Sequence, residues 1–361
     1  MSSTVAILPF LLPDTRRTGN CRNGLIEASD PHRQSKHSSN ELSDEENEMG
    51  AYLVTGVAGF IGSALASALL NAGHAVIGLD DLSTGSKSNI PSGVSFYKGG
   101  CHEPGSYAQL PDAPYDAFFH MAGQSCDEAS FDDPVQDLKA NTLATLHLLQ
   151  FARKCACKRF IYASSMAVYG SPTEMPVQED AAPAPLSFHG VNKLASEQYL
   201  RLYEQYGVRS TALRFFSVYG PGRNTNSMRQ DMIGTFMAMM LNNGHIHVRG
   251  TPNRFRDFIY IDDVVQACLL CLERKNSQGL SINIGSGCRV QVGELVDKLC
   301  AMCGTPVTVE YSGRTVGDVF GIHADVNIAA KYLGFEAETG LEDGLKRMYE
   351  WYTRTRAGRN S

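Results

Sequence analysis

Short apolar runs alternate with longer amphipathic stretches between residues 51 and 215. A run of about four to eight apolar residues predicts a buried strand, whereas apolar positions recurring every three or four residues predict a helix. The predicted strands cover residues 51–56, 75–81, 94–100, 115–123, 159–165 and 209–215. The predicted helices cover residues 60–73, 134–154 and 189–207. This alternation predicts an α/β fold, a doubly wound parallel sheet with helices on both faces.

The pattern changes at both ends of this region. Residues 1–48 are mostly polar and charged, which predicts a disordered extension. Beyond Pro221 the alternation loosens into helices and short strands. We therefore expect residues 49–220 to form one domain and residues 221–361 a smaller lobe, partly interleaved with it. The predicted helices of this lobe lie near residues 228–243, 262–274, 292–303 and 341–355.

The turn after the first predicted strand contains three glycines at three-residue intervals, in the stretch TGVAGFIG. Gly56, Gly59 and Gly62 permit a tight turn and let backbone N–H groups reach a pyrophosphate. Asp80 ends the second strand, where a carboxylate can accept hydroxyls of an adenosine ribose. No Arg or Lys directly follows Asp80 to accept a 2′-phosphate. The pattern predicts a Rossmann-like domain that binds NAD rather than NADP.

A second cofactor contact is predicted at the end of the fourth strand. Ala122 and Gly123 are small enough for a dinucleotide to lie across the strand tip. Ligands of open α/β sheets bind at this edge, outside the carboxyl ends of the strands.

The composition argues against several classes of protein. A formal net charge of -6 argues against a nucleic-acid-binding protein. No apolar run approaches the roughly 20 residues that span a bilayer, so we expect no membrane segment. The C-x-x-C pairs at residues 268–271 and 300–303 fall in amphipathic helices, which favours core packing over a metal site. The ten cysteines follow no disulfide-scaffold spacing, so a cytoplasmic protein is expected.

Six motifs follow one another in a characteristic order: TGVAGFIG, LDDLSTG, ASSMAVYG, GVNK, LRFFSVYGPG and RFRDFIYIDDV. Over residues 50–355 the chain resembles extended short-chain dehydrogenases/reductases, and among them nucleotide-sugar epimerases of the UDP-glucose 4-epimerase type. The resemblance implies tightly held NAD, which removes hydride from carbon 4 of the sugar and returns it to the other face of a transient 4-keto sugar. It also implies a homodimer in which helices 134–154 and 189–207 pair across the interface.

The family uses a catalytic Tyr, a Lys four residues later and a Ser or Thr upstream. These positions are Ser165, His189 and Lys193 here, so a histidine replaces the phenol. A neutral imidazole can act as a base. However, the nearby Lys193 charge should lower its pKa, and its ring is shorter than a phenol. We therefore expect an epimerase with reduced activity.

The resemblance also assigns the remaining site residues. The residues implied to contact the cofactor are Gly56, Gly59, Phe60, Ile61, Gly62, Asp80, Asp81, Ala122, Gly123, Asn141, Ser164, Lys193 and Phe216. Those implied to contact the substrate are Ser165, Ser217, Arg223, Arg256, Arg314 and Asp318. Two positions depart from the family: Gly100 replaces a common Asp near the adenine, and Ser217 replaces a common Asn near the diphosphate. Each loses a side-chain hydrogen bond, typically about 0.5–1.5 kcal/mol.

The residues directly after the catalytic serine indicate the reaction type. Related dehydratases place acidic residues there to expel water, whereas this chain has Met166 and Ala167. The segment therefore favours epimerisation over elimination. Two alternatives remain open: a weak or inactive protein of the same fold that binds NAD or a nucleotide sugar, and a related nucleotide-sugar reductase.

Overall fold

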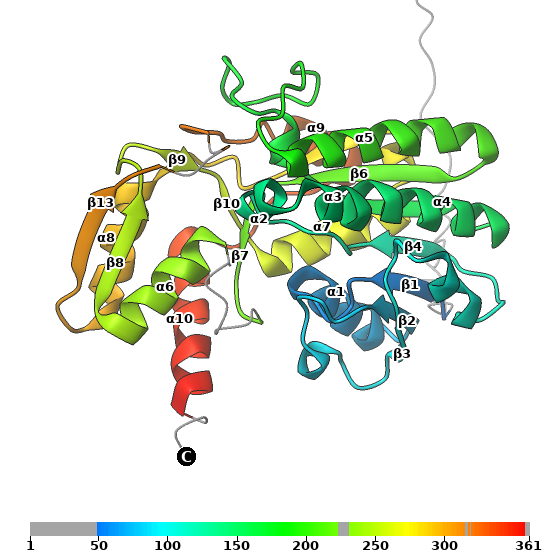
Figure 1. Cartoon of the computed structure of the whole chain (residues 1–361), viewed down its shortest axis with the longest axis horizontal. Coiled ribbons are helices and arrows are strands. Elements are labelled where there is room, and N and C mark those ends of the chain that lie inside the picture. Colours follow the sequence, from blue (N-terminus) through cyan, green and yellow to red (C-terminus); the bar gives the residue numbers. More distant parts are fainter. Residues whose placement is uncertain (1–48, 223–230, 315–316, 318, 358–361) are drawn as a thin grey trace, which may run out of the picture. The chain divides into compact units, whose positions relative to one another are not determined.

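Seven parallel strands form the central sheet of the computed structural model, which describes residues 49–222, 231–314, 317 and 319–357 (Figure 1). Their spatial order is β11–β6–β5–β4–β1–β2–β3. They are β1 (Ala51–Thr55), β2 (Ala75–Asp80), β3 (Ser95–Lys98), β4 (Ala117–His120), β5 (Arg159–Ser165), β6 (Arg209–Phe215) and β11 (Ser281–Ile284). The six strands predicted before residue 221 are all present, and the doubly wound α/β fold is confirmed.

The strand order reverses between β1 and β4. The chain runs outward from β1 through β2 to β3, then returns to pair β4 with the other edge of β1. Thr55 and His120 are register partners at the carboxyl ends of β1 and β4. This reversal opens a crevice beyond the strand ends, which is where doubly wound sheets bind ligands.

Helices cover both faces of the sheet because neighbouring strand residues point to opposite faces. Val54 packs in one core with α1 (Phe60–Asn71) and α7 (Ile261–Glu273). Leu53 packs in a second core with α4 (Ala144–Lys154) and α5 (Phe188–Tyr203). Both residues are fully buried, as a parallel sheet covered on two sides requires.

The helix predicted over residues 134–154 is interrupted. It consists of α3 (Pro134–Leu138), a π turn (Lys139–Leu143) and α4. A π turn inserts one extra residue into the helical repeat and rotates the side chains that follow it; such turns are frequent at functional sites. Asn141, a predicted cofactor contact, lies on this turn.

The C-terminal part of the chain builds a smaller group of elements around the parallel pair β8 (His245–Arg249) and β13 (Thr308–Ser312). This pair lies away from the central sheet (Figure 1). Around it are α6 (Met232–Asn243), α8 (Val292–Cys303) and α10 (Leu341–Ala357). Shorter elements are α2 (Asp127–Asp132), β7 (Ser217–Tyr219), β9 (Phe255–Arg256), β10 (Phe258–Tyr260), β12 (Val290–Gln291) and α9 (Asn327–Leu333).

The later part of the chain also completes the central sheet, because β11 pairs with β6. A boundary between domains at residue 220 stays a prediction. Cys268 and Cys271 are fully buried and Cys300 and Cys303 pack against the same core, as the core-packing interpretation expects. Across the residues that the structure describes, no helix combines the length and the apolar character needed to cross a membrane.

Candidate active site

The turn after β1 packs so closely against neighbouring backbone that it leaves no room for side chains at two of its glycines. Gly56 has a φ of 70° and its N–H donates to the Leu79 carbonyl at 2.8 Å. A Cβ on Gly56 would lie 2.7 Å from the backbone nitrogen of Ala122, and one on Gly62 would lie 2.1 Å from the Gly56 carbonyl oxygen. The turn, the start of α1 and the end of β4 therefore meet backbone to backbone. Such a close turn at a helix N-terminus lets backbone N–H groups bind a pyrophosphate.

Asp80 connects this turn to β2. Its carboxylate accepts backbone N–H groups from Ala58 at 2.9 Å and Leu82 at 2.8 Å. Burial raises the pKa of Asp80, although these two hydrogen bonds oppose the shift. Each oxygen keeps a lone pair for a further donor, such as a ribose hydroxyl. The neighbouring Asp81 is exposed and accepts the N–H of Ser83.

Polar groups converge beyond the end of β4. The Asn141 amide donates to the Gln124 carbonyl at 3.1 Å, while its Oδ1 is buried with no hydrogen-bond partner in the described structure. A Cβ on Gly123 would lie 2.6 Å from that Oδ1 and 3.3 Å from Lys193 Nζ. Because Gly123 has no side chain, Asn141 Oδ1 and the Lys193 ammonium can both lie close to the end of β4. A buried acceptor without a partner suits a polar ligand group, so these residues fit a dinucleotide lying across the tip.

Lys193 and His189 lie on adjacent turns of α5, and both are buried. Lys193 Nζ donates to the Ala163 carbonyl at 2.8 Å and lies 4.9 Å from the centre of the Tyr162 ring. Burial lowers the pKa of Lys193 to about 8, with the carboxylates of Asp137 and Glu197 partly offsetting the shift.

His189 is 3 % exposed and is neutral at pH 7. Burial, reinforced by the charge on Lys193, lowers its pKa to about 3, although a hydrogen bond to the Gln124 backbone favours the protonated form. Its Nδ1 is buried and makes no hydrogen bond within the described part of the chain. The imidazole can therefore accept a proton, but it holds that proton weakly.

The neutral imidazole makes stability depend on pH. An unfolded His189 takes up a proton below a pKa of about 6.5, whereas the folded chain keeps it neutral down to about pH 3. Between about pH 6.5 and pH 3 only the unfolded chain binds this proton. The free energy of unfolding is therefore unaffected by His189 above pH 6.5 and falls as the pH is lowered toward 3. Between pH 7 and pH 5 we expect the wild type to lose about 2 kcal/mol more unfolding free energy than His189→Tyr, measured by urea denaturation. Identical losses in the two proteins would show that folded His189 binds a proton.

A buried ion pair lies on the next turn of the same helix. Arg214 donates Nε to Glu197 Oε1 at 3.0 Å and a terminal nitrogen to Oε2 at 2.7 Å. Ser164 and Ser281 also donate to this carboxylate, at 2.5 and 3.0 Å. Burial alone would raise the pKa of Glu197, but the bidentate arginine outweighs it and lowers the pKa. The pair fixes α5 against the ends of β5, β6 and β11.

Removing one member of this pair should destabilise the fold. In Glu197→Ala the Arg214 charge stays buried without its carboxylate, so we expect the free energy of unfolding to fall by about 3–5 kcal/mol in urea titration. Lys298→Ala is the matched control, because Lys298 bonds Glu342 at an exposed site and should change stability little. Equal effects of the two substitutions would contradict the prediction.

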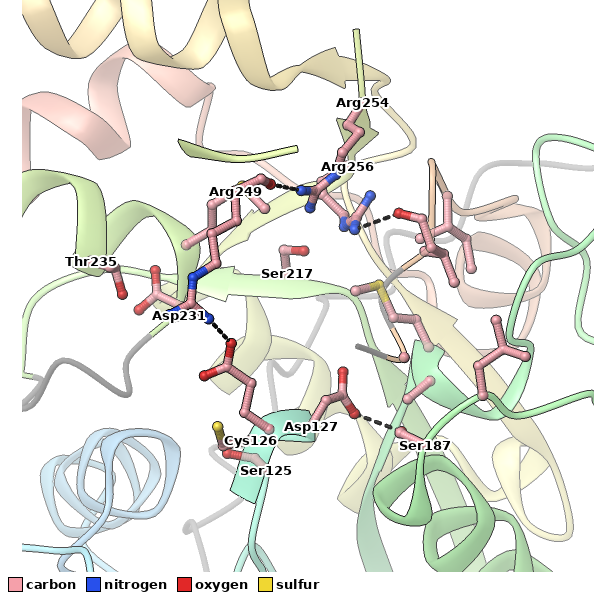
Figure 2. A pocket seen from close by; sticks show the side chains of 18 of the residues that line it. Ser125, Cys126, Asp127, Ser187, Ser217, Asp231, Thr235, Arg249, Arg254 and Arg256 are labelled. Atoms are coloured by element: carbon pink, nitrogen blue, oxygen red, sulfur yellow. Dashed lines mark hydrogen bonds and ion pairs between the residues drawn. The ribbon is translucent and has the colours of Figure 1, made fainter. Parts of the chain in front are cut away.

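A cavity of about 590 Å³ lies between the strand ends and the C-terminal elements (Figure 2). Ser217 and Arg256, both predicted substrate contacts, line it. Arg256 is buried and donates to the carbonyls of Phe255 and Val319, at 2.7 and 2.8 Å. Met166 and Ala167, which directly follow Ser165, form another part of the wall.

The predicted trio lies outside the lining of this cavity. Ser165, His189 and Lys193 do not line the cavity. Ser165 Oγ accepts the N–H of Ala167 at 3.2 Å, which fixes the start of the wall segment. The lining of this cavity therefore does not by itself bring the trio against a ligand.

The other predicted residues are distributed differently. Ser164 directs its hydroxyl to Glu197, and Phe216 is buried in an apolar cluster with Tyr169. Phe60 and Ile61 are half-buried on the first turn of α1. Arg314 is exposed and does not line the cavity. The two substrate contacts that lie outside the described residues are Arg223 and Asp318.

Sequence reasoning missed several polar residues of the site. Asp127 and Arg249 line the cavity, and Arg249 forms an ion pair with Glu128 across it. Asp127 could have been predicted from the sequence, because it lies shortly after the end of the fourth predicted strand, at the edge where such sheets bind ligands. Glu197 could have been found from its position four residues after Lys193 on one helix face. Arg249 could not, because only folding brings β8 to this edge.

Comparison with known proteins agrees with the geometry. Residues 52–285 match the model of the NAD dependent epimerase/dehydratase family. A putative UDP-glucose 4-epimerase of Methanocaldococcus jannaschii is 34% identical over 301 residues, 83% of this chain and 97% of that protein. The structure is similar to that of Thermotoga maritima UDP-glucose 4-epimerase with UDP-glucose, with TM-score 0.80, 32% identity and coverage of 85% and 99% of the two chains. It is also similar to MoeE5 in complex with UDP-glucuronic acid and NAD, with TM-score 0.75, 32% identity and coverage of 85% and 100%.

Proposed function

Because the chain belongs to the NAD-dependent epimerase/dehydratase family, we propose that it is an NAD-dependent nucleotide-sugar 4-epimerase acting on a UDP-sugar. The observation that carries the proposal is the buried Lys193 ammonium beside Gly123 and Asn141, at the strand-order reversal. The relatives named for UDP-glucose 4-epimerase activity support the choice of reaction.

Each part of the site has a separate task in this reaction. Bound NAD supplies the acceptor and then the donor of the hydride at carbon 4. The glycine turn holds the pyrophosphate, and the Lys193 ammonium stabilises negative charge developing on the carbon-4 oxygen. His189 Nδ1 accepts the hydroxyl proton and returns it, while the Ser165 hydroxyl can share it. With a pKa of about 3, His189 is a weak base, and the proposal includes slow turnover.

Epimerisation is favoured over loss of water. Related dehydratases place an acidic residue directly after the catalytic serine to protonate the leaving hydroxyl, whereas Met166 and Ala167 occupy that part of the wall here. The second candidate is a nucleotide-sugar-binding protein without turnover. It is favoured by one specific observation: His189 is buried and does not line the cavity.

The test is conversion of UDP-glucose to UDP-galactose by the NAD-loaded protein, followed by chromatography. Formation of UDP-galactose by the wild type or by His189→Tyr supports an epimerase. Lys193→Met is the negative control, since it removes the ammonium. Binding of UDP-glucose without turnover in both the wild type and His189→Tyr would overturn the epimerase in favour of the binding protein.

A homodimer in the cytoplasm completes the proposal. Apolar side chains on neighbouring helices α3 and α5 are exposed, and such a face suits burial against a second copy. Its exposed members are Val135, Leu138, Phe188, Val191 and Leu202. The nine cysteines in the described ranges are free thiols, which suits a reducing compartment.

We expect Val191→Glu to convert the dimer to a monomer, because it places a charge in the centre of this face. Sedimentation velocity measures the change, with Tyr311→Glu as a control at an exposed aromatic residue on β13. A wild-type protein that sediments as a monomer would overturn the dimer.

A further inference from the structure

Asp137 is a fully buried carboxylate on α3. Three side-chain amides donate to it: Gln124 to Oδ1 at 2.8 Å, Asn141 to Oδ1 at 3.2 Å and Asn192 to Oδ2 at 2.6 Å. Gln124 lies shortly after β4, Asn141 lies on the π turn and Asn192 lies on α5. The carboxylate therefore joins α3 to three other segments of the site.

The three amides favour the ionised form of this carboxyl group. A protonated carboxyl would place a hydroxyl where an amide N–H already points, whereas an ionised one is an acceptor only. Burial raises the pKa of Asp137, but the amide hydrogen bonds and the charge on Lys193 oppose that shift. Asn192 cannot turn its oxygen to this group, because its Oδ1 accepts the Thr142 hydroxyl at 3.0 Å.

The carboxylate fixes which way the amide of Asn141 faces. Asn141 Nδ2 lies 3.2 Å from Asp137 Oδ1, 3.2 Å from the Asp137 carbonyl oxygen and 3.1 Å from the Gln124 carbonyl oxygen. All three atoms are acceptors, so the nitrogen of the amide and not its oxygen must face them. Of the three, the carboxylate is the charged one, and hydrogen bonds to charged groups are roughly twice as strong. Asn141 Oδ1 is thereby directed away from Asp137.

The oxygen of Asn141 faces the end of β4 beside a donor. A Cβ on Gly123 would lie 2.6 Å from Asn141 Oδ1 and 3.3 Å from Lys193 Nζ, so an acceptor and a donor adjoin at one point. A hydroxyl both donates and accepts and therefore matches this pair. Because β2 and β4 flank β1, a dinucleotide with its adenosine ribose at Asp80 brings its nicotinamide ribose to Gly123.

We propose that Asp137 is a positioning residue for the cofactor, which holds Asn141 with its acceptor oxygen toward the nicotinamide half of NAD. The inference rests on the NAD site of the proposed function. In Asp137→Asn a second amide faces the existing donors, so Asn141 loses its charged acceptor. Its nitrogen can then turn toward Lys193, where two donors would meet and the ribose hydroxyl would lack an acceptor.

Calorimetric titration of the full chain, freed of bound nucleotide, with NAD and with ADP tests this. ADP lacks the nicotinamide half, so a general loss of structure affects both ligands, whereas a turned Asn141 affects NAD alone. We expect Asp137→Asn to weaken NAD binding by about tenfold, the effect of one lost hydrogen bond, and to leave ADP affinity unchanged. Asp133→Asn is the matched control, because it makes the same change at the exposed N-cap of the same helix and should keep both affinities.

An exchange of the two side chains provides a second test. In the double variant Asp137→Asn/Asn141→Asp the amide at position 137 can donate to the carboxylate at position 141, whose other oxygen still faces the cofactor. We expect its NAD affinity to return to within about threefold of the wild type. In Asn141→Ala, which has no acceptor to orient, adding Asp137→Asn should weaken NAD binding no further.

The outcomes separate this inference from the proposed function. Unchanged NAD affinity in Asp137→Asn, equal losses for NAD and ADP, or no recovery in the exchanged variant would overturn the positioning role while the NAD site survives. Failure of the wild type to bind either NAD or ADP would overturn the proposed function and this inference with it.

Discussion

We expect His189→Tyr to raise kcat for UDP-glucose epimerisation by about 10²- to 10⁴-fold, the usual contribution of a general acid–base group. A phenol oxygen lies farther from the backbone than the imidazole nitrogens do, and His189 itself does not line the cavity. The nearby Lys193 ammonium lowers the pKa of a phenol and so stabilises the phenolate needed to take the carbon-4 proton. The same ammonium lowers the pKa of the imidazole and so weakens it as a base.

The variant His189→Phe distinguishes the effect of a longer side chain from the effect of an ionisable hydroxyl group. Phenylalanine fills the same space as tyrosine but carries no proton, so its kcat should not exceed that of the wild type. Steady-state assays over pH 6 to 9 compare the three proteins. If His189→Tyr is no faster than the wild type, histidine is a competent proton carrier here and the explanation from pKa and reach is wrong.

We expect Gly62→Ala to weaken NAD binding by about 10- to 100-fold, because the loss of one backbone hydrogen bond to the charged pyrophosphate costs about 1.5–3 kcal/mol. The added Cβ would lie 2.1 Å from the Gly56 carbonyl oxygen. Since that atom is backbone, α1 must move away from the turn, and the N–H groups facing the pyrophosphate move with it. Calorimetric titration with NAD measures the loss.

Gly105→Ala is the control for this substitution. A Cβ on Gly105 meets no atom within 4 Å, so NAD affinity should stay at the wild-type value. Unchanged NAD affinity in a folded Gly62→Ala protein would show that the dinucleotide is not held by the turn after β1.

The sequence alone determined the order and type of the main elements. Strands such as β1 and β4 are buried on both faces, so their residues are mostly apolar, and such runs are visible without any partner. The glycine turn was equally visible, because close backbone contact excludes side chains at fixed positions. The strands of two or three residues, β7, β9, β10 and β12, are too short to leave a periodic pattern.

Only the tertiary structure decided which polar residues meet. Ser165, His189 and Lys193 were predicted from local motifs, but their position outside the cavity lining depends on how α5 packs. Arg249 reaches Glu128 across 121 residues of sequence. The spacing of apolar residues along a helix or strand shows which of its faces is buried, because the same face is buried at each turn or at every second residue. Contacts between distant elements leave no repeat, so the walls of the cavity emerge only when the chain is folded.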